Sequence, residues 1–276
     1  MEKKKMLFSI KNNPIGIFIF GLIQATIRRM EPKAIMQLRF MIIYPALVLL
    51  LQGGCSKDDI DLNDTSWYIT IVENNAPTYG FDFPVEPGEM DGWKEPSAPV
   101  PETDPSFDPS SYLANREDGI HPAIDFFKED GSSAAGHELW AIGEGVVVDI
   151  VYDREAYPAK HDGGDRDAGW GNLILIQHDY IENGVNKRVY AQYAHCATIE
   201  VELNEVVKRN QRIGLVGHTD GVIGTESWND HLHFEIRITN FRADVWPQGI
   251  GLTTDEVVSQ HYTHPLEFIR AHRPAD

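Results

Sequence analysis

The sequence predicts a mostly β fold, with an antiparallel, sandwich-like or barrel-like sheet in its C-terminal part. From about residue 119, short segments rich in β-branched and aromatic residues follow one another. Turn-favouring glycines, or the Asn183-Gly184 pair, lie between many of them. No long stretch has the 3.6-residue period of an amphipathic helix, apart from a short helix predicted near Pro265–Ala271.

The predicted strands occupy seven segments, one of which holds two strands around a glycine turn. In chain order these segments are Ile120–Phe127, Leu139–Val151 (the pair), Leu173–His178, Val189–His195, Thr198–Glu202, Gln211–Val216 and His231–Ile238. Between two of them, Asp153–Gly169 is polar and glycine-rich, which predicts a surface loop. Three aspartates in this loop raise the alternative of a calcium site, but they lack the spacing of a known calcium loop.

Residues 56–115 are acidic and proline-rich, and we interpret them as a linker that precedes a domain over residues 116–276. Within the linker, Trp67–Val72 has the composition of one strand, and Phe81–Val85 that of a short edge strand. Glu95–Ser111 has no periodic signal. The length and irregularity of Glu73–Ser111 permit this stretch to cover a cleft of the domain.

The chain of 276 residues is 42% hydrophobic, which excludes a wholly disordered protein. Its 42 acidic and 24 basic residues are divided unevenly. Residues 1–55 carry 8 basic and 2 acidic side chains, so residues 56–276 have a net charge of −24. Such an acidic surface repels phosphate backbones, and we therefore expect no nucleic-acid partner. The two cysteines, Cys55 and Cys196, exclude a disulfide framework as the source of stability.

The N-terminal 55 residues have the features of a targeting segment. Arg39 gives a positive start, Phe40–Leu51 is apolar, and Gly53-Gly54-Cys55 ends the segment with small residues and a cysteine. Residues 36–55 resemble a bacterial lipoprotein signal peptide with Cys55 as the lipidated residue, although Gln52 stands where leucine is commonest. Residues 1–35 would then be an extension before the true start at Met36. An uncleaved N-terminal anchor is the alternative.

The resemblance to a lipoprotein implies a membrane-anchored protein of the cell envelope, in the outer membrane and periplasm or at the cell surface. The run that follows Cys55, Ser56-Lys57-Asp58-Asp59, is similar to tethers that direct some lipoproteins to the surface. A solvated charge run is an equally good interpretation.

Histidines and one aspartate carry the chemistry that the sequence suggests. His231 and His233 are two residues apart on a predicted strand, so their side chains point to the same face. His121 and Asp125 are four residues apart, and His195 ends another strand. A catalytic Zn²⁺ takes three protein ligands of these types, and a further histidine can move protons. Each pair taken alone also fits ordinary buried polar residues.

Taken together, these segments resemble the lysostaphin/LytM-type zinc metallopeptidases, which cleave peptides of peptidoglycan. That family has a His-x-Gly-x-Asp start, a Tyr-x-His block and a His-x-His-Phe-Glu block. The matching segments here are His121–Asp125, Tyr193–His195 and His231–Glu235, with Ala123 in place of the glycine. The likeness covers residues 119–268 and includes Gly169-Trp-Gly-Asn172 and His264-Pro-Leu-Glu-Phe268.

The resemblance implies that His121, Asp125 and His233 bind Zn²⁺, and that His195 and His231 are the catalytic residues that transfer protons. It also implies a zinc cleft bordered by long loops and a metalloendopeptidase that acts on peptidoglycan peptides. Cys196 stands where the family has leucine, and we interpret it as a buried apolar residue. Two alternatives stay open: a non-catalytic relative that activates another cell-wall hydrolase, and a zinc peptidase that acts on proteins.

Overall fold

The computed structural model describes residues 65–73, 75–96, 105–116, 119–152, 171–218 and 230–274. The chain divides into two compact units, residues 1–59 and 60–276, and all described residues belong to the second. The predicted signal segment with Cys55, the extension before it and the loop Asp153–Gly169 lie outside the described residues. No helix within the described ranges is long and apolar enough to cross a membrane.

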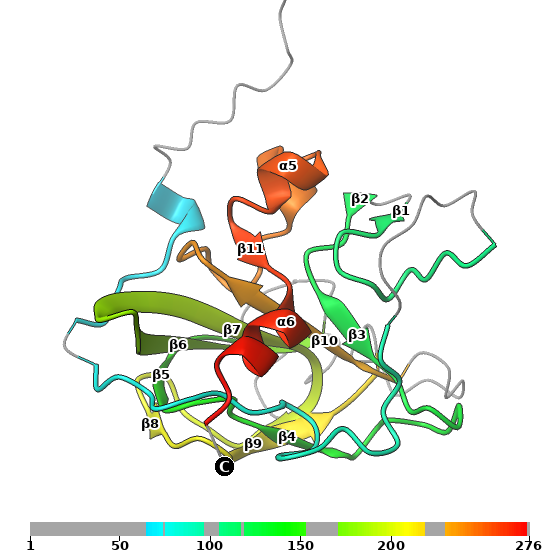
Figure 1. Cartoon of the computed structure of the whole chain (residues 1–276), viewed down its shortest axis with the longest axis horizontal. Coiled ribbons are helices and arrows are strands. Elements are labelled where there is room, and N and C mark those ends of the chain that lie inside the picture. Colours follow the sequence, from blue (N-terminus) through cyan, green and yellow to red (C-terminus); the bar gives the residue numbers. More distant parts are fainter. Residues whose placement is uncertain are drawn as a thin grey trace, which may run out of the picture. The chain divides into compact units, whose positions relative to one another are not determined.

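The described part is mostly β, as predicted, and all pairs of named strands run antiparallel (Figure 1). The strands are β1 (Asn115–Arg116), β2 (Gly119–Ile120), β3 (Ile124–Phe126), β4 (Glu138–Trp140), β5 (Gly145–Val151), β6 (Asn172–Glu182), β7 (Val185–Ile199), β8 (Val206–Val207), β9 (Arg212–Val216), β10 (Leu232–Arg237) and β11 (Tyr262–Thr263). The helical elements are short: η2 (Thr65–Trp67), η4 (Pro247–Ile250), α5 (Asp255–Val258) and α6 (Pro265–Ala271).

One sheet of nine strands holds the fold together. Its central path is β11-β10-β7-β6-β5-β8, while β3 pairs with β10, and β9 links β4 to β7. The hairpin between β6 and β7 turns at Asn183 and Gly184, which both have positive φ (51° and 77°), as the two-residue turn requires. The predicted turn is therefore confirmed. The helix α6 has the predicted bounds.

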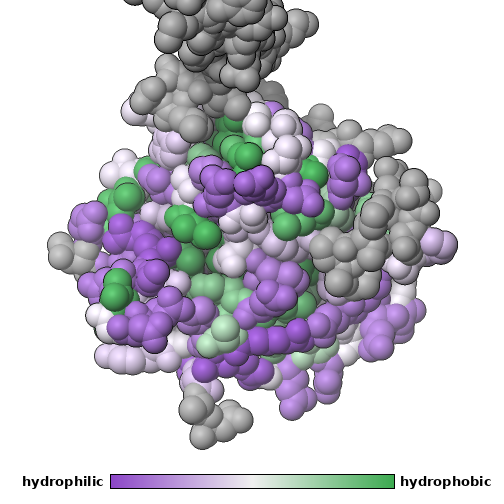
Figure 2. Space-filling view, turned by 45° about the horizontal axis from the view of Figure 1, so that its top comes forward, coloured by the Kyte–Doolittle hydropathy of each residue, from purple (hydrophilic) through white to green (hydrophobic). Residues whose placement is uncertain are grey.

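Both faces of the sheet are buried. Along β6, Ile174 and Ile176 belong to the main hydrophobic cluster, whereas the alternate residues Leu173 and Leu175 belong to a smaller one on the opposite face. Ala194 on β7 is part of the smaller cluster. The metal-site candidates described below share this second face. Figure 2 shows one face of the molecule, where hydrophilic residues surround separate apolar areas.

Two strand predictions were wrong in the stretch before residue 116. Trp67–Val72 forms no strand. Its backbone pairing is limited to an isolated bridge between Tyr68 and Phe241, and at Val72 the backbone pairs with the side chain of Gln177 instead (3.0 and 2.7 Å). Phe81–Val85 also forms no strand. The Asp82 carboxylate accepts hydrogen bonds from the backbone N–H groups of Phe83 and Gly88 (both 2.9 Å), which curls this segment into a turn.

The stretch that the sequence suggests as a linker contributes to the core. Phe81, Phe83, Trp93 and Tyr112 are buried in the main hydrophobic cluster. Arg270 of α6 also pairs with the Glu95 carboxylate (2.7 Å). We therefore propose that the domain begins before residue 65 instead of at residue 116.

A third difference concerns β7, which is one strand of 15 residues instead of two shorter ones. His195 lies in the middle of it with a positive φ of 61°, and the pairing registers shift on both sides of this position. This is a β-bulge, which interrupts side-chain alternation without ending the strand. The predicted break between His195 and Thr198 is therefore a bulge in a continuous strand.

Candidate metal centre

Three elements bring the predicted ligands together on one face of the sheet. On β10, His233 lies opposite Asp125 of β3 on one side and opposite Ala194 of β7 on the other. His121 lies in the short connection between β2 and β3, which interrupts the strand predicted over Ile120–Phe127. Cross-strand neighbours in an antiparallel sheet point to the same face, so the pairing itself aims His233 and Asp125 at one spot.

The three side chains form a tight and buried cluster. Asp125 Oδ1 lies 3.1 Å from His121 Nε2 and 3.0 Å from His233 Nδ1, and the two nitrogens are 3.2 Å apart. A tetrahedral zinc site with bonds of about 2.0–2.1 Å has distances of about 3.3 Å between its ligand atoms. Two imidazole nitrogens and one carboxylate oxygen at this spacing fit a zinc ion, with the fourth position left for water.

Outer hydrogen bonds fix which nitrogen of each histidine faces the cluster. His121 Nδ1 lies 2.9 Å from the Ser111 carbonyl oxygen, an acceptor, so Nδ1 carries the proton and Nε2 presents its lone pair inward. His233 Nε2 lies 2.9 Å from Glu235 Oε1, which leaves Nδ1 to face inward. Metal-binding histidines commonly donate their second N–H to a carbonyl or carboxylate in this way.

The charge states of the cluster also suit a cation. Burial lowers the pKa of His121, so this side chain is neutral at pH 7. Burial alone would raise the pKa of Asp125, but the facing imidazoles of His121 and His231 hold it well below its usual range. Burial also lowers the pKa of His233, yet its hydrogen bonds to Asp125 and Glu235 outweigh this effect and raise it. A metal ion binds the neutral imidazole of His233, so metal affinity is expected to fall at low pH.

His195 and His231, predicted to transfer protons, lie next to the three ligand candidates. Their ring centroids are 4.7 Å apart, and His231 Nε2 is 3.7 Å from Asp125 Oδ1. The bulge of β7 turns the His195 ring toward β10, where its centroid is 5.7 Å from that of His233. His231 stacks on Phe127 at a centroid distance of 4.6 Å. All five predicted site residues are thus brought together.

The Glu235 carboxylate, which contacts His233 Nε2, is part of a buried ion pair with Arg237. Glu235 Oε2 accepts a hydrogen bond from Arg237 Nε (2.6 Å), and both side chains are fully buried. The Arg237 guanidinium also donates to the carbonyl oxygen of Arg242 (2.6 Å) and more weakly to those of Phe241, Ala243 and Val245 (3.3–3.4 Å). The pair therefore connects His233 to the loop that follows β10.

Sequence reasoning gave no role to Arg237 and missed Phe127 and Arg116 as neighbours of the site. A signal for Arg237 was present, because His233, Glu235 and Arg237 alternate along β10 and must share a face. Arg116 contacts Asp125 from a separate short strand, and nothing in the spacing of the sequence indicates that contact.

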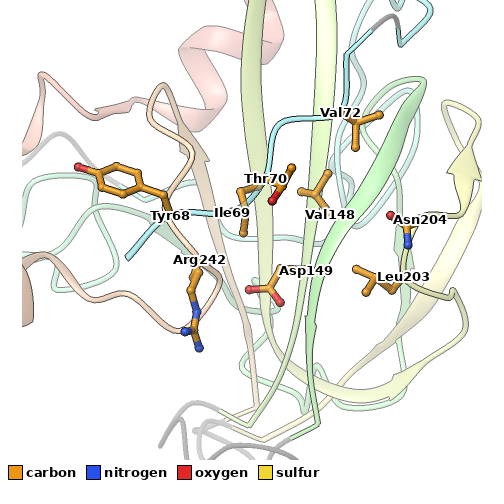
Figure 3. A pocket seen from close by; sticks show the side chains of 9 residues that line it. All are labelled: Tyr68, Ile69, Thr70, Val72, Val148, Asp149, Leu203, Asn204 and Arg242. Atoms are coloured by element: carbon orange, nitrogen blue, oxygen red, sulfur yellow. The ribbon is translucent and has the colours of Figure 1, made fainter. Parts of the chain in front are cut away.

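A pocket of about 410 Å³ lies apart from this cluster (Figure 3). The segment Tyr68–Val72 forms one side of it, and Val148 and Asp149 of β5 form another. Leu203, Asn204 and Arg242 complete the lining, and none of the five site residues is among them.

All five clustered residues lie within residues 119–245, and this stretch matches the sequence profile of Peptidase family M23. The chain contains an M23 peptidase domain. The curated relatives include an uncharacterized lipoprotein, YgeR, of Escherichia coli (strain K12), which is 32% identical over 122 residues. Another is the peptidoglycan DD-endopeptidase ShyB of Vibrio cholerae, 30% identical over 115 residues.

These matches cover 44% and 42% of this chain, but only 36% of YgeR and 21% of ShyB. The similar solved structures include the catalytic domain of lysostaphin from Staphylococcus simulans, with 22% identity and a TM-score of 0.35. That match covers 64% of this chain and 91% of the lysostaphin chain. A zinc-containing peptidase from Vibrio cholerae also has 22% identity and a TM-score of 0.35, over 60% of this chain and 38% of the other.

Proposed function

We propose that this protein is a zinc-dependent endopeptidase that hydrolyses peptide bonds in peptidoglycan. The observation that carries the proposal is the spacing of the three donor atoms of His121, Asp125 and His233, each 3.0–3.2 Å from the other two. Their orientation by outer hydrogen bonds and the presence of two further histidines beside them support a catalytic site over a structural one.

The residues of the chain take separate roles in this proposal. His121, Asp125 and His233 hold the zinc ion, which when bound lowers the pKa of its water molecule to about 7 and polarises the substrate carbonyl. His231 lies against the carboxylate of Asp125, where its imidazole can accept the proton of the attacking water. His195, aimed by the bulge, can donate a proton to the leaving amine and a hydrogen bond to the developing oxyanion.

Peptidoglycan is the proposed substrate because the related protein ShyB is named a peptidoglycan DD-endopeptidase. The proposed location is the cell envelope, with a lipid anchor at Cys55. The signal-like segment 36–55 and the relative named a lipoprotein support this location.

Two other functions stay open. A non-catalytic relative that activates another hydrolase would not need all five site residues, and here all five are present and clustered. A zinc peptidase that acts on proteins is the second, since a net charge of −24 on residues 56–276 does not favour an anionic cell wall.

The test is digestion of intact peptidoglycan sacculi by residues 56–276, which contain the whole compact unit 60–276, with zinc quantified beforehand. The expected products are muropeptides with cut peptides, identified by mass. Their release should stop on chelation and resume with added zinc. His195→Ala is the matched control, because it should keep zinc and lose hydrolysis. If the zinc-loaded protein releases no product, the endopeptidase proposal is wrong, and cleavage of an unfolded protein substrate would point to the second alternative.

A further inference from the structure

The segment Pro109–Arg116 packs against His121 and Asp125, two of the three proposed metal ligands. It precedes residues 119–245, which match the family. Backbone hydrogen bonds fasten it there. The Asp125 N–H donates to the Ser110 carbonyl (3.0 Å), the His121 N–H donates to the Ala114 carbonyl (2.9 Å), and the Leu113 N–H donates to the His121 carbonyl (2.8 Å). The segment therefore holds the backbone of both His121 and Asp125.

The same segment also contacts the ligand side chains. As described above, the Ser111 carbonyl fixes the tautomer of His121. Arg116 Nη2 donates to Asp125 Oδ2 at 2.5 Å. Arg116 Nε donates to the Pro109 carbonyl at 2.6 Å, which fixes the plane of the guanidinium. The Asp125 side chain is 5% exposed and that of Arg116 is 23% exposed, so water screens this pair only weakly.

We propose that Arg116 is a positioning residue of the metal centre, which holds Asp125 so that it binds the metal through Oδ1 alone. The two carboxylate oxygens have different partners: Oδ1 faces the ligand nitrogens of His121 and His233, and Oδ2 faces the guanidinium. A carboxylate held at both oxygens cannot rotate to give both of them to one ion. This inference rests on the proposed zinc site.

A second consequence concerns the extent of the functional unit. The family match begins at residue 119, after the segment that holds His121 and Asp125. A protein that begins at residue 116 would lose the Ser110 and Ser111 contacts, and one that begins at residue 119 would lose Arg116 as well. The metal centre of this chain therefore requires residues from Pro109 onward, and removal of the segment would weaken metal binding instead of exposing a blocked site.

The experiment compares Arg116→Met and Arg116→Lys with the wild type in residues 56–276. Arg212→Met is the matched control, because Arg212 also pairs with carboxylates, those of Glu138 and Glu200, but is 46% exposed. Zinc affinity is measured by competition with a chelator of known affinity. Loss of such an outer contact typically lowers metal affinity about 10–100-fold, which is the result expected for Arg116→Met. Arg116→Lys keeps the charge and one donor and should recover part of the loss, and Arg212→Met should equal the wild type.

The second readout is the visible absorption of the Co²⁺-loaded proteins, which a merely structural role of Arg116 would not change. A four-coordinate Co²⁺ ion absorbs more strongly than a five-coordinate one. If Asp125 turns to bind through both oxygens in Arg116→Met, the absorption should fall relative to the wild type. Circular dichroism checks that each variant is folded. If Arg116→Met does not fold, zinc affinity and Co²⁺ absorption are compared between Arg116→Lys and the wild type instead.

Each outcome separates this inference from the proposed function. If the wild type binds no zinc, the zinc site itself is wrong. If the wild type binds zinc and the Arg116 variants match it in both zinc affinity and Co²⁺ absorption, the positioning role is wrong and the zinc site stands.

Discussion

Replacement of Arg237 by methionine should remove a large part of the protein's stability. Arg237 and Glu235 are both fully buried, with Nε and Oε2 2.6 Å apart. The variant leaves the Glu235 carboxylate without its cation in the interior, which typically costs about 3–5 kcal/mol. The Arg242 carbonyl also loses its 2.6 Å donor, at about 1 kcal/mol. We therefore expect the free energy of unfolding to fall by about 4–6 kcal/mol, against a total of about 5–15 kcal/mol for a typical domain.

The pH dependence of this loss has a definite sign. Burial raises the pKa of Glu235, and Arg237 offsets this effect so that the pKa is lowered overall. Without Arg237 the pKa of Glu235 should rise, because only His233 then opposes the effect of burial. Protonation of Glu235 relieves the uncompensated charge, so the difference in stability between variant and wild type should shrink as the pH falls.

Urea unfolding of the zinc-free proteins, followed by circular dichroism, measures the effect without a contribution from metal binding. The exposed Arg212, which pairs with Glu138 and Glu200, provides the control, and Arg212→Met should cost less than about 1 kcal/mol. If Arg237→Met lies within 1 kcal/mol of the wild type, the Glu235–Arg237 pair does not stabilise the fold as argued.

Three further predictions concern other buried groups. Burial lowers the pKa of His178 to about 4. The neutral imidazole should therefore contribute stability above pH 6.5 that is lost as the pH falls toward 4. Urea unfolding should show a loss of about 3 kcal/mol over this range in the wild type but not in His178→Gln. Gly217→Ala places a Cβ 2.7 Å from the His195 carbonyl oxygen, and hydrolysis should fall at least about tenfold with zinc retained. Gly249→Ala is the control for Gly217→Ala, because the space around Gly249 is open. Equal rates of hydrolysis in the two variants would show that the contact of Gly217 with the His195 carbonyl does not affect activity. Burial raises the pKa of the Cys196 thiol, so a thiol reagent should react with it only after unfolding, and rapid reaction of the folded protein would contradict its burial.

The local patterns of the sequence were sufficient to predict much of the fold, whereas the set of five site residues came from the resemblance to the metallopeptidase family. Alternation along the predicted strand His231–Ile238 placed His231 and His233 on one face, and the Asn183-Gly184 pair identified the hairpin between β6 and β7. Helix α6 begins with Pro265 and has the predicted bounds. These features depend on residues close together in the chain, so sequence reasoning could find them.

The prediction at Phe81–Val85 failed through a local contact, because Asp82 accepts hydrogen bonds from the nearby backbone N–H groups of Phe83 and Gly88. The other differences depended on contacts between distant residues. Trp67–Val72 has the composition of a strand, but it makes only an isolated bridge from Tyr68 to Phe241, and Val72 pairs with the side chain of Gln177, 105 positions away. The bulge at His195 is stabilised by a hydrogen bond from the Gly217 N–H to the His195 carbonyl (2.7 Å), which no local pattern encodes. The contact between Arg116 and Asp125 is also a product of the folded chain.

The most direct test of the metal centre is the zinc content of purified residues 56–276 after dialysis against metal-free buffer, measured by elemental analysis. We expect one zinc ion per wild-type chain, one per His195→Ala chain, and none in Asp125→Ala or His233→Ala. If Asp125→Ala and His233→Ala each retain one tightly bound zinc ion, these residues are not the ligands, and the proposed site is wrong.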